Sequence, residues 1–327
     1  MHKSAFWALP ILALVAFSCT DGNELEYEAF GYRHDKTLAD YEDVAASNDP
    51  SRPDFAPVVF FTYSLDGTNN EEYVPSGTLI NAEWVLTAGH NFFDAQEQNS
   101  PAPVSGLEVR IGNDPNTTQA VYAVAEVVYH PTWRDGQQDY QDANDLCLVR
   151  LATPVADVAP AILYTTTTES LDSEVWFCGF GDYTEWEGGD VNSFSKKHAM
   201  ANRLDRAVEG FSTQANGTTY AGGLLAFDFD DPDGIVNSLG DDYVGEDEEL
   251  LGEGSSQAVA LEYEGTTVQG DSGGPLFVKN GDNWQLAGVL TGGANRPIRN
   301  HRDGDYGDIS IFTRVSTSIE WIKSVVE

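Results

Sequence analysis

The chain after residue 54 consists of short apolar runs separated by clusters of Gly, Asn, Asp and Pro. These runs are rich in Val, Ile, Phe, Tyr and Thr, the residues that strands prefer. No alternating helices separate them, so the pattern predicts an all-β barrel or sandwich. The predicted strands are 58–63, 77–80, 84–87, 107–111, 120–129, 146–151, 175–178, 284–290 and 309–312.

The C-terminal residues follow a helical pattern instead. Ile319, Ile322 and Val326 recur at the spacing of one helix face. Thr317 and Glu320 form a T-x-x-E string, which is the sequence of a capping box. We therefore predict an amphipathic terminal helix that begins at this box.

The first eighteen residues are typical of a secretory signal. The apolar run from Ala5 to Phe17 is short for a membrane span but suits a signal-peptide core. The residues up to Cys19 resemble a bacterial lipobox, so both a chain anchored through a lipid on Cys19 and a plainly secreted chain stay open. Residues 19–54 are polar and predict a tether or a pro-segment. Both outcomes place the protein outside the cytoplasm of a bacterium.

Charge and cysteine content narrow the function classes. The 327 residues include 53 acidic and 17 basic ones, a formal net charge of −36 at pH 7. Such a charge argues against binding nucleic acids and against docking on anionic lipid headgroups. Three cysteines exclude a disulfide-rich scaffold. Cys147 and Cys178 lie in apolar runs, which predicts two buried, unpaired thiols. A disulfide between them stays open.

One segment, about 221–255, has eleven acidic residues and no Lys or Arg. We interpret it as a solvated acidic surface loop inserted into the domain. Clustered carboxylates also suit Ca²⁺, but Pro232 falls where an EF-hand loop needs a ligand, so no metal is assigned.

The strongest chemical signal is the string G-D-S-G-G-P at residues 270–275. A serine hydroxyl is a poor nucleophile unless a base takes its proton. Glycines around it allow a sharp turn whose N–H groups can point at a forming oxyanion. Ser272 is therefore the candidate nucleophile.

Two further strings supply the groups that such a serine needs. T-A-G-H ends at His90, directly after the predicted strand 84–87, and its small residues leave the imidazole room to move. D-L-C-L-V starts at Asp145, a carboxylate at the mouth of an apolar strand that can hold the imidazole tautomer.

In the order His, Asp, Ser, these strings resemble the chymotrypsin/trypsin-like serine peptidase family, which reads T-A-A-H, D-I-A-L-L and G-D-S-G-G-P. That order separates the family from subtilisins and α/β-hydrolases. The resemblance runs from about residue 55 to the end. It implies two six-stranded antiparallel β-barrels, about 55–160 and 161–327, with the active site between them.

The resemblance also implies the chemistry. Ser272 would attack a peptide or ester carbonyl, His90 would take and return the proton, and Asp145 would orient His90. The backbone N–H groups of Gly270 and Ser272 would form the oxyanion hole. No cofactor is needed, the substrate would be a protein or peptide, and the chain is expected to be a monomer.

Further positions matched to the family concern substrate binding. Thr291 would support Asp145, and Thr291, Gly292 and Gly293 would pair with the substrate backbone. Thr266 would form the floor of the P1 pocket, with Gly293 and Ser310 as its walls.

Trypsin-like members carry Asp at the pocket floor, so Thr266 does not indicate Arg or Lys at P1. A neutral slot favours apolar or small P1 residues. Asp305 and Asp308 keep a negatively charged pocket open as an alternative.

Two departures from the family concern stability and activation. Asn91 stands where the family has a cysteine, so that disulfide is absent. Many members are cut after a basic residue, and the new amine then pairs with the Asp next to the serine, here Asp271. No basic residue precedes an I-V-G-G string. Arg33 is a candidate cut, and another cation for Asp271, or no cut at all, stays open.

Rival functions come from other classes. G-D-S-G-G also fits the nucleophile elbow of α/β-hydrolases, but only His301 follows it and βαβ patterning is missing. A catalytically silent binding protein on the same fold and an esterase are the remaining alternatives.

Overall fold

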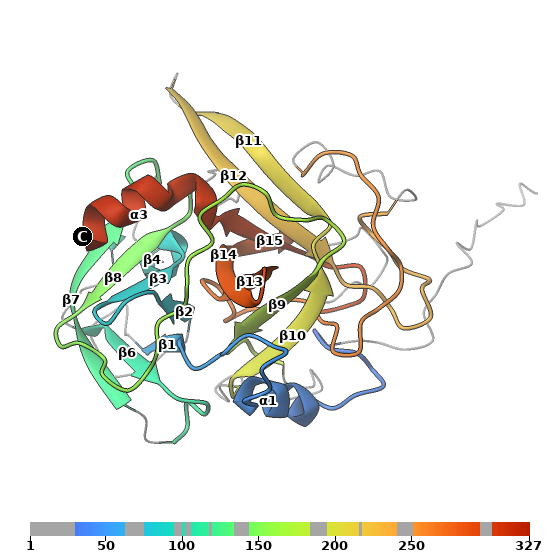
Figure 1. The fold of residues 1–327 in the computed structure, drawn as a ribbon, viewed down its shortest axis with the longest axis horizontal. Coiled ribbons are helices and arrows are strands. Elements are labelled where there is room, and N and C mark those ends of the chain that lie inside the picture. Colours follow the sequence, from blue (N-terminus) through green and yellow to red (C-terminus); the bar gives the residue numbers. More distant parts are fainter. Residues whose placement is uncertain are drawn as a thin grey trace, which may run out of the picture.

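The computed structural model describes residues 30–62, 75–94, 100–101, 106–117, 120–133, 144–183, 195–215, 218–240, 251–294 and 303–327. It shows two antiparallel β units side by side (Figure 1). The expected signal segment, Cys19 and His301 lie outside these residues.

The first unit is a closed six-stranded barrel with the order β1-β2-β3-β8-β7-β6, as expected. Successive side chains of a strand point to opposite faces. In β1, Val59 and Phe61 accordingly join the barrel interior, whereas Val58 and Phe60 join the core shared with the second unit. Its elements are β1 (Val58–Thr62), β2 (Ser76–Leu79), β3 (Trp84–Thr87), η1 (Gly89–Phe92), β4 (Phe93–Asp94), β5 (Ser100–Pro101), β6 (Glu108–Ile111), β7 (Ala120–Tyr129) and β8 (Cys147–Leu151), where β4 and β5 form a separate small sheet.

The second unit is an antiparallel sheet with the order β10-β9-β13-β14-β15-β12-β11. A second antiparallel β unit is thus confirmed, but the described residues give it seven strands rather than the expected six. The long strands β11 and β12 pair with each other and project beyond the rest of the sheet (Figure 1). Its strands are β9 (Glu174–Gly179), β10 (His198–Arg203), β11 (Arg206–Ala215), β12 (Thr218–Asp228), β13 (Pro275–Asn280), β14 (Asn283–Ala294) and β15 (Ile309–Arg314).

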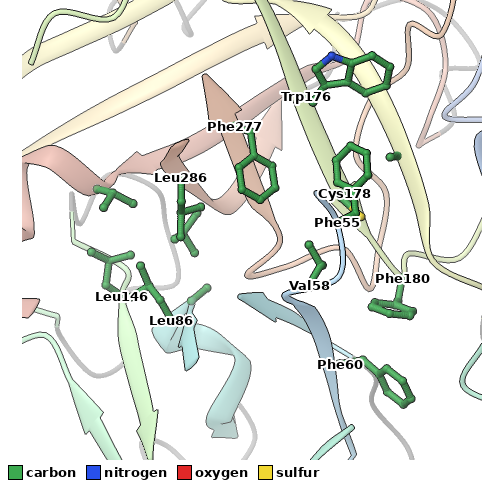
Figure 2. Packing of buried hydrophobic residues seen from close by; sticks show 14 of the residues in the cluster. Phe55, Val58, Phe60, Leu86, Leu146, Trp176, Cys178, Phe180, Phe277 and Leu286 are labelled. Carbon is green, nitrogen blue, oxygen red and sulfur yellow. The ribbon is translucent and has the colours of Figure 1, made fainter. Parts of the chain in front are cut away.

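A continuous apolar core joins the two units. Leu86 and Leu146 of the first unit lie in one cluster with Phe277 and Leu286 of the second (Figure 2). Phe55 packs on Phe277 with ring centroids 6.1 Å apart. Each such side chain contributes about 1.5–3 kcal/mol when fully buried. This core therefore fixes the loops of one unit relative to those of the other.

Both cysteines of the described residues are buried, free thiols, as predicted. Cys147 lies in the barrel core and Cys178 in the shared core. Burial raises the pKa of both thiols, so they remain protonated and unreactive.

The predicted C-terminal helix is present as η4 (Val315–Ser318) followed by α3 (Ile319–Val326). Ile319 and Ile322 are buried in the shared core. The predicted capping box is wrong, because Ser318 is the N-cap residue and Thr317 instead donates to the carbonyl of Arg314 at 2.7 Å. Because of the 3-10 turn ahead of it, α3 starts at Ile319, one residue later than a cap at Thr317 predicts.

Residues 30–46, which we call the N-terminal arm, pack on the second unit. The arm contains a helix that was not predicted, α1 (Leu38–Ala46), which lies beside β10 (Figure 1). The backbone N–H of Thr37 donates to the carboxylate of Asp40 at 2.8 Å, which caps the chain entering the helix. Tyr41 is fully buried, and its hydroxyl donates to the carbonyl of Glu264 at 2.9 Å.

The interpretation of the acidic segment as a solvated loop is wrong for three of its residues. Asp228, Asp230 and Asp231 are 1%, 4% and 2% exposed. Asp231 accepts the N–H groups of Ile235 and Val236 at 2.6 Å, which orders the turn after β12. The sequence predicted a solvated face because it does not show the backbone N–H groups that donate to these carboxylates.

Asp230 makes the stability of the fold fall as the pH rises from about 4 toward 10. Burial raises its pKa to about 10, and the nearby carboxylates of Asp228 and Glu264 act in the same direction. A carboxyl group with a raised folded-state pKa contributes stability below its unfolded pKa of about 4 and loses it as the pH rises toward 10.

We expect Asp230→Asn to stabilise the protein at pH 8 by more than about 1.4 kcal/mol, the equivalent of one pKa unit. Denaturant unfolding at pH 5 and pH 8 measures this. The exposed neighbour Asp233 offers the control Asp233→Asn, which should change little. Equal pH dependence in Asp230→Asn and the wild type would disprove the explanation.

Candidate active site

The ends of two neighbouring strands bring His90 and Asp145 together. β3 and β8 pair antiparallel with Thr87 opposite Cys147, so η1, which follows β3, lies beside the residues that precede β8. The His90 backbone N–H donates to Asp145 Oδ1 at 2.8 Å. His90 Nδ1 lies 2.5 Å from Asp145 Oδ2. The backbone and the ring of His90 are thus oriented by one carboxylate.

Thr291 of the second unit completes this contact. Its hydroxyl donates to Asp145 Oδ2 at 2.7 Å. The Asp145 side chain is 3% exposed and that of His90 is 27% exposed. Burial opposes the charged form of His90, but the charge and hydrogen bond of Asp145 outweigh it and raise the pKa of His90. The carboxylate is therefore fixed by both units and stabilises a proton on the imidazole.

Ser272 lies in the turn before β13, and its backbone is anchored to the first unit. Its carbonyl accepts the Ser76 N–H at 2.9 Å and the Asn91 side-chain amide at 3.0 Å. Asn91 directly follows His90 and also donates to the Thr87 hydroxyl at 3.0 Å. A hydrogen-bonded amide thus links the loop of His90 to the turn of Ser272.

The residue after the serine has to be glycine. Gly273 has φ +83°, and a Cβ there would come within 2.1 Å of the Thr87 hydroxyl and 2.3 Å of the Ser76 carbonyl. The absence of a side chain at Gly273 allows residues 268–274, which we call the serine turn, to lie directly against the first unit. Among the described residues, the N–H groups of Gly270 and Ser272 donate no hydrogen bond, which leaves them available to an oxyanion.

The expected pocket residues also lie together. Thr266 and Ser310 are buried, and their hydroxyl oxygens are 2.9 Å apart. Ser310 of β15 pairs with Gly293 of β14, next to Gly292. Asp308 is buried, and its carboxylate accepts the Gly304 N–H at 2.7 Å. Two neutral hydroxyls therefore form the contact between the expected floor and wall.

A comparison with protein families decides the assignment. The family model described as Trypsin matches residues 55–223 and 241–322. The chain belongs to the trypsin family. The platelet-aggregating proteinase PA-BJ of Bothrops jararaca is a relative that is 27% identical over 263 residues, covering 79% of this chain and 86% of the relative.

Membership of the trypsin family supports a peptidase, and hence a hydrolase with protein or peptide substrates. Enzymes of this family are typically secreted. Among the described residues, no helix is both long and apolar enough to cross a membrane. Within the same residues, no group of three His, Cys, Asp or Glu side chains is arranged to hold a metal ion.

Sequence reasoning missed two residues beside the serine turn. Tyr183 donates its hydroxyl to Asp271 Oδ2 at 2.6 Å, and His198 Nε2 lies 3.2 Å from Asp271 Oδ1. The sequence alone indicates no role for His198. Its position 73 residues before Asp271 carries no local signal, and only the pairing of β10 with β9 places it there.

Proposed function

We propose that this protein is a serine endopeptidase that works through Ser272, His90 and Asp145. The observation that carries the proposal is the chain of hydrogen bonds from Thr291 through Asp145 to His90. The turn of Ser272 is tied to the residue that follows this histidine. A serine, a histidine and an aspartate linked in this way, on a trypsin-family fold, suit acyl transfer.

We propose one task for each of these groups. Asp145 faces Nδ1 of His90, so Nδ1 carries the proton and Nε2 is left as the base. His90 would take the Ser272 proton as the oxygen attacks the carbonyl, and would return it to the leaving amine. The N–H groups of Gly270 and Ser272 would stabilise the oxyanion, and water would then hydrolyse the acyl-enzyme. The raised pKa of His90 suits its transient protonation.

Substrate preference would follow from the pocket. The hydroxyl pair of Thr266 and Ser310 is neutral, and Gly293, which pairs with Ser310, adds no side chain. We propose that P1 is small or apolar, while Thr291, Gly292 and Gly293 at the end of β14 pair with the substrate backbone.

A panel of peptide amides that differ only at P1 tests this function. We expect cleavage after Ala, Val or Leu to exceed cleavage after Arg or Lys by at least about tenfold in kcat/KM, the equivalent of about 1.4 kcal/mol. A matched panel of esters accompanies it. Hydrolysis of esters alone would favour an esterase, and hydrolysis of neither series would favour a silent binding protein. A preference for Arg or Lys at P1 would contradict the proposal that the P1 pocket is neutral.

The same proposal places the enzyme outside the cytoplasm of a bacterium, with Cys19 as the candidate lipid anchor. Mass analysis of the N-terminal peptide distinguishes an acylated Cys19 from an unmodified cleaved end. A retained apolar run from Ala5 to Phe17 would contradict the proposal.

A further inference from the structure

Asp271 lies at the centre of the serine turn and is fully buried. Its Oδ1 accepts the N–H of Gly181 at 2.7 Å, and its Oδ2 accepts the N–H of Val268 at 3.0 Å. The Tyr183 hydroxyl donates to Oδ2 as well. Burial and the neighbouring Asp271 charge raise the pKa of Tyr183, so this phenol remains a donor. Both oxygens of Asp271 therefore act as acceptors, which is the pattern of an ionised carboxylate.

The ring of His198 is placed between two acceptors. Its Nδ1 lies 3.1 Å from the Lys196 carbonyl oxygen, which can only accept, so Nδ1 carries a proton. Its Nε2 faces the Asp271 carboxylate, so this nitrogen carries a proton too. An imidazole with protons on both nitrogens is a cation. The side chains of His198 and Asp271 are both 0% exposed, and a buried carboxylate needs such a partner.

An aromatic ring and a strand hold the histidine there. The Tyr183 and His198 rings have centroids 4.1 Å apart with 70° between their planes. His198 begins β10, where it pairs with Gly179 of β9. The position of the His198 cation is therefore fixed by the sheet, and it does not depend on a new N-terminal amine released by cleavage.

We infer that His198 is the built-in cation that holds the serine turn in its working form, so this protein needs no cut to supply an amine to Asp271. The inference rests on the function proposed above. His198 is a positioning residue, because it acts through Asp271 and the turn.

The N-terminal arm supports this inference. Gly31 has φ +83°, and a Cβ there would come within 2.2 Å of the Tyr183 ring. The carbonyl oxygen of Gly31 accepts the Thr266 N–H at 2.9 Å. The Arg33 guanidinium binds the Asp35 carboxylate and donates to the Leu261 carbonyl at 2.7 Å. The intact arm therefore packs against Tyr183 and the pocket floor, and cleavage after Arg33 would sever it within this contact.

The first experiment uses Arg33→Gln and a fluorophosphonate probe that modifies active serines. Intact mass verifies that residues 30–54 are still attached in the labelled molecules. We expect the uncut wild type and R33Q to be labelled at rates within about twofold of each other. Labelling only after limited proteolysis near Arg33 would overturn the inference and leave the proposed function standing. Labelling of neither the uncut nor the cut chain would overturn the proposed function.

The second experiment addresses the charge of His198. Replacement of one partner leaves a buried charge unpaired, so His198→Gln should lower the labelling rate at least tenfold. The matched control is His130→Gln, at a histidine whose pKa burial lowers to about 4 and which is therefore already neutral. Its labelling rate should stay within about twofold of the wild type. A folded H198Q protein with the wild-type rate would disprove the role.

A measurement on the wild type covers the case in which H198Q does not fold. A long-range proton–nitrogen correlation spectrum at pH 7, assigned through the backbone of His198, reports both ring nitrogens. We expect both to carry protons. If either ring nitrogen of His198 carries no proton, His198 is not a cation and the inference is wrong, whether or not H198Q folds.

Discussion

Replacement of Ser272 by alanine is expected to lower kcat on the best peptide of the P1 panel by about 10⁶, the scale seen when a serine nucleophile is removed. The hydroxyl is lost, while the backbone contacts of the turn remain, since Ser76, Asn91 and Leu290 bind main-chain atoms of Ser272 and Gly273. Steady-state hydrolysis and circular dichroism measure activity and folding in the same samples.

Ser324→Ala is the control for this variant, because Ser324 is exposed on α3. It should retain wild-type kcat. A folded Ser272→Ala protein that retains a tenth or more of the activity would mean that another group is the nucleophile.

Asp145→Asn is expected to lower kcat by about 10⁴ with little change in KM. The asparagine fits the same space, but it no longer obliges Nδ1 of His90 to carry the proton. The imidazole can then present the wrong tautomer to Ser272. Hydrolysis kinetics over a pH series measure the effect.

The pH profile gives this variant a second readout. In the wild type the base must be neutral, so kcat/KM rises with pH through the raised pKa of His90. Without the Asp145 charge this pKa falls, and the acid limb should move to lower pH. Asp157→Asn, at an exposed residue, should leave the profile in place. If the acid limb of kcat/KM stays at the same pH in Asp145→Asn, a group other than His90 controls that limb.

The sequence predicted most of the strands that carry apolar side chains, but β11, β12 and β13 were not among the predicted ranges. β1, β3 and β7 agree with their predicted ranges to within one residue. β10 was missed, since its six residues include His198, Asn202 and Arg203, which are poor strand signals. Its polar side chains are satisfied inside the fold, as when Asn202 donates to the carbonyls of Asp228 and Gly265. Such long-range partners override local propensity.

The candidate site could be predicted as far as local strings carry its chemistry. Residues 270–275, His90 and Asp145 each lie in a short string, and Thr291 came from the resemblance. Tyr183 and His198 could not be found, because Asp271 accepts from them across 88 and 73 residues. Asn91 was noted only for the absence of a cysteine, although its amide makes the link between the units.

The free, buried state of Cys147 and Cys178 has a consequence for the surroundings in which the enzyme works. No covalent cross-link joins the elements of the described structure, so thiol reductants have no bond to break in it. Protonated, enclosed sulfur atoms are also poor targets for peroxide. The described fold therefore depends on no disulfide, and we expect it to keep the same conformation in oxidising and in reducing media.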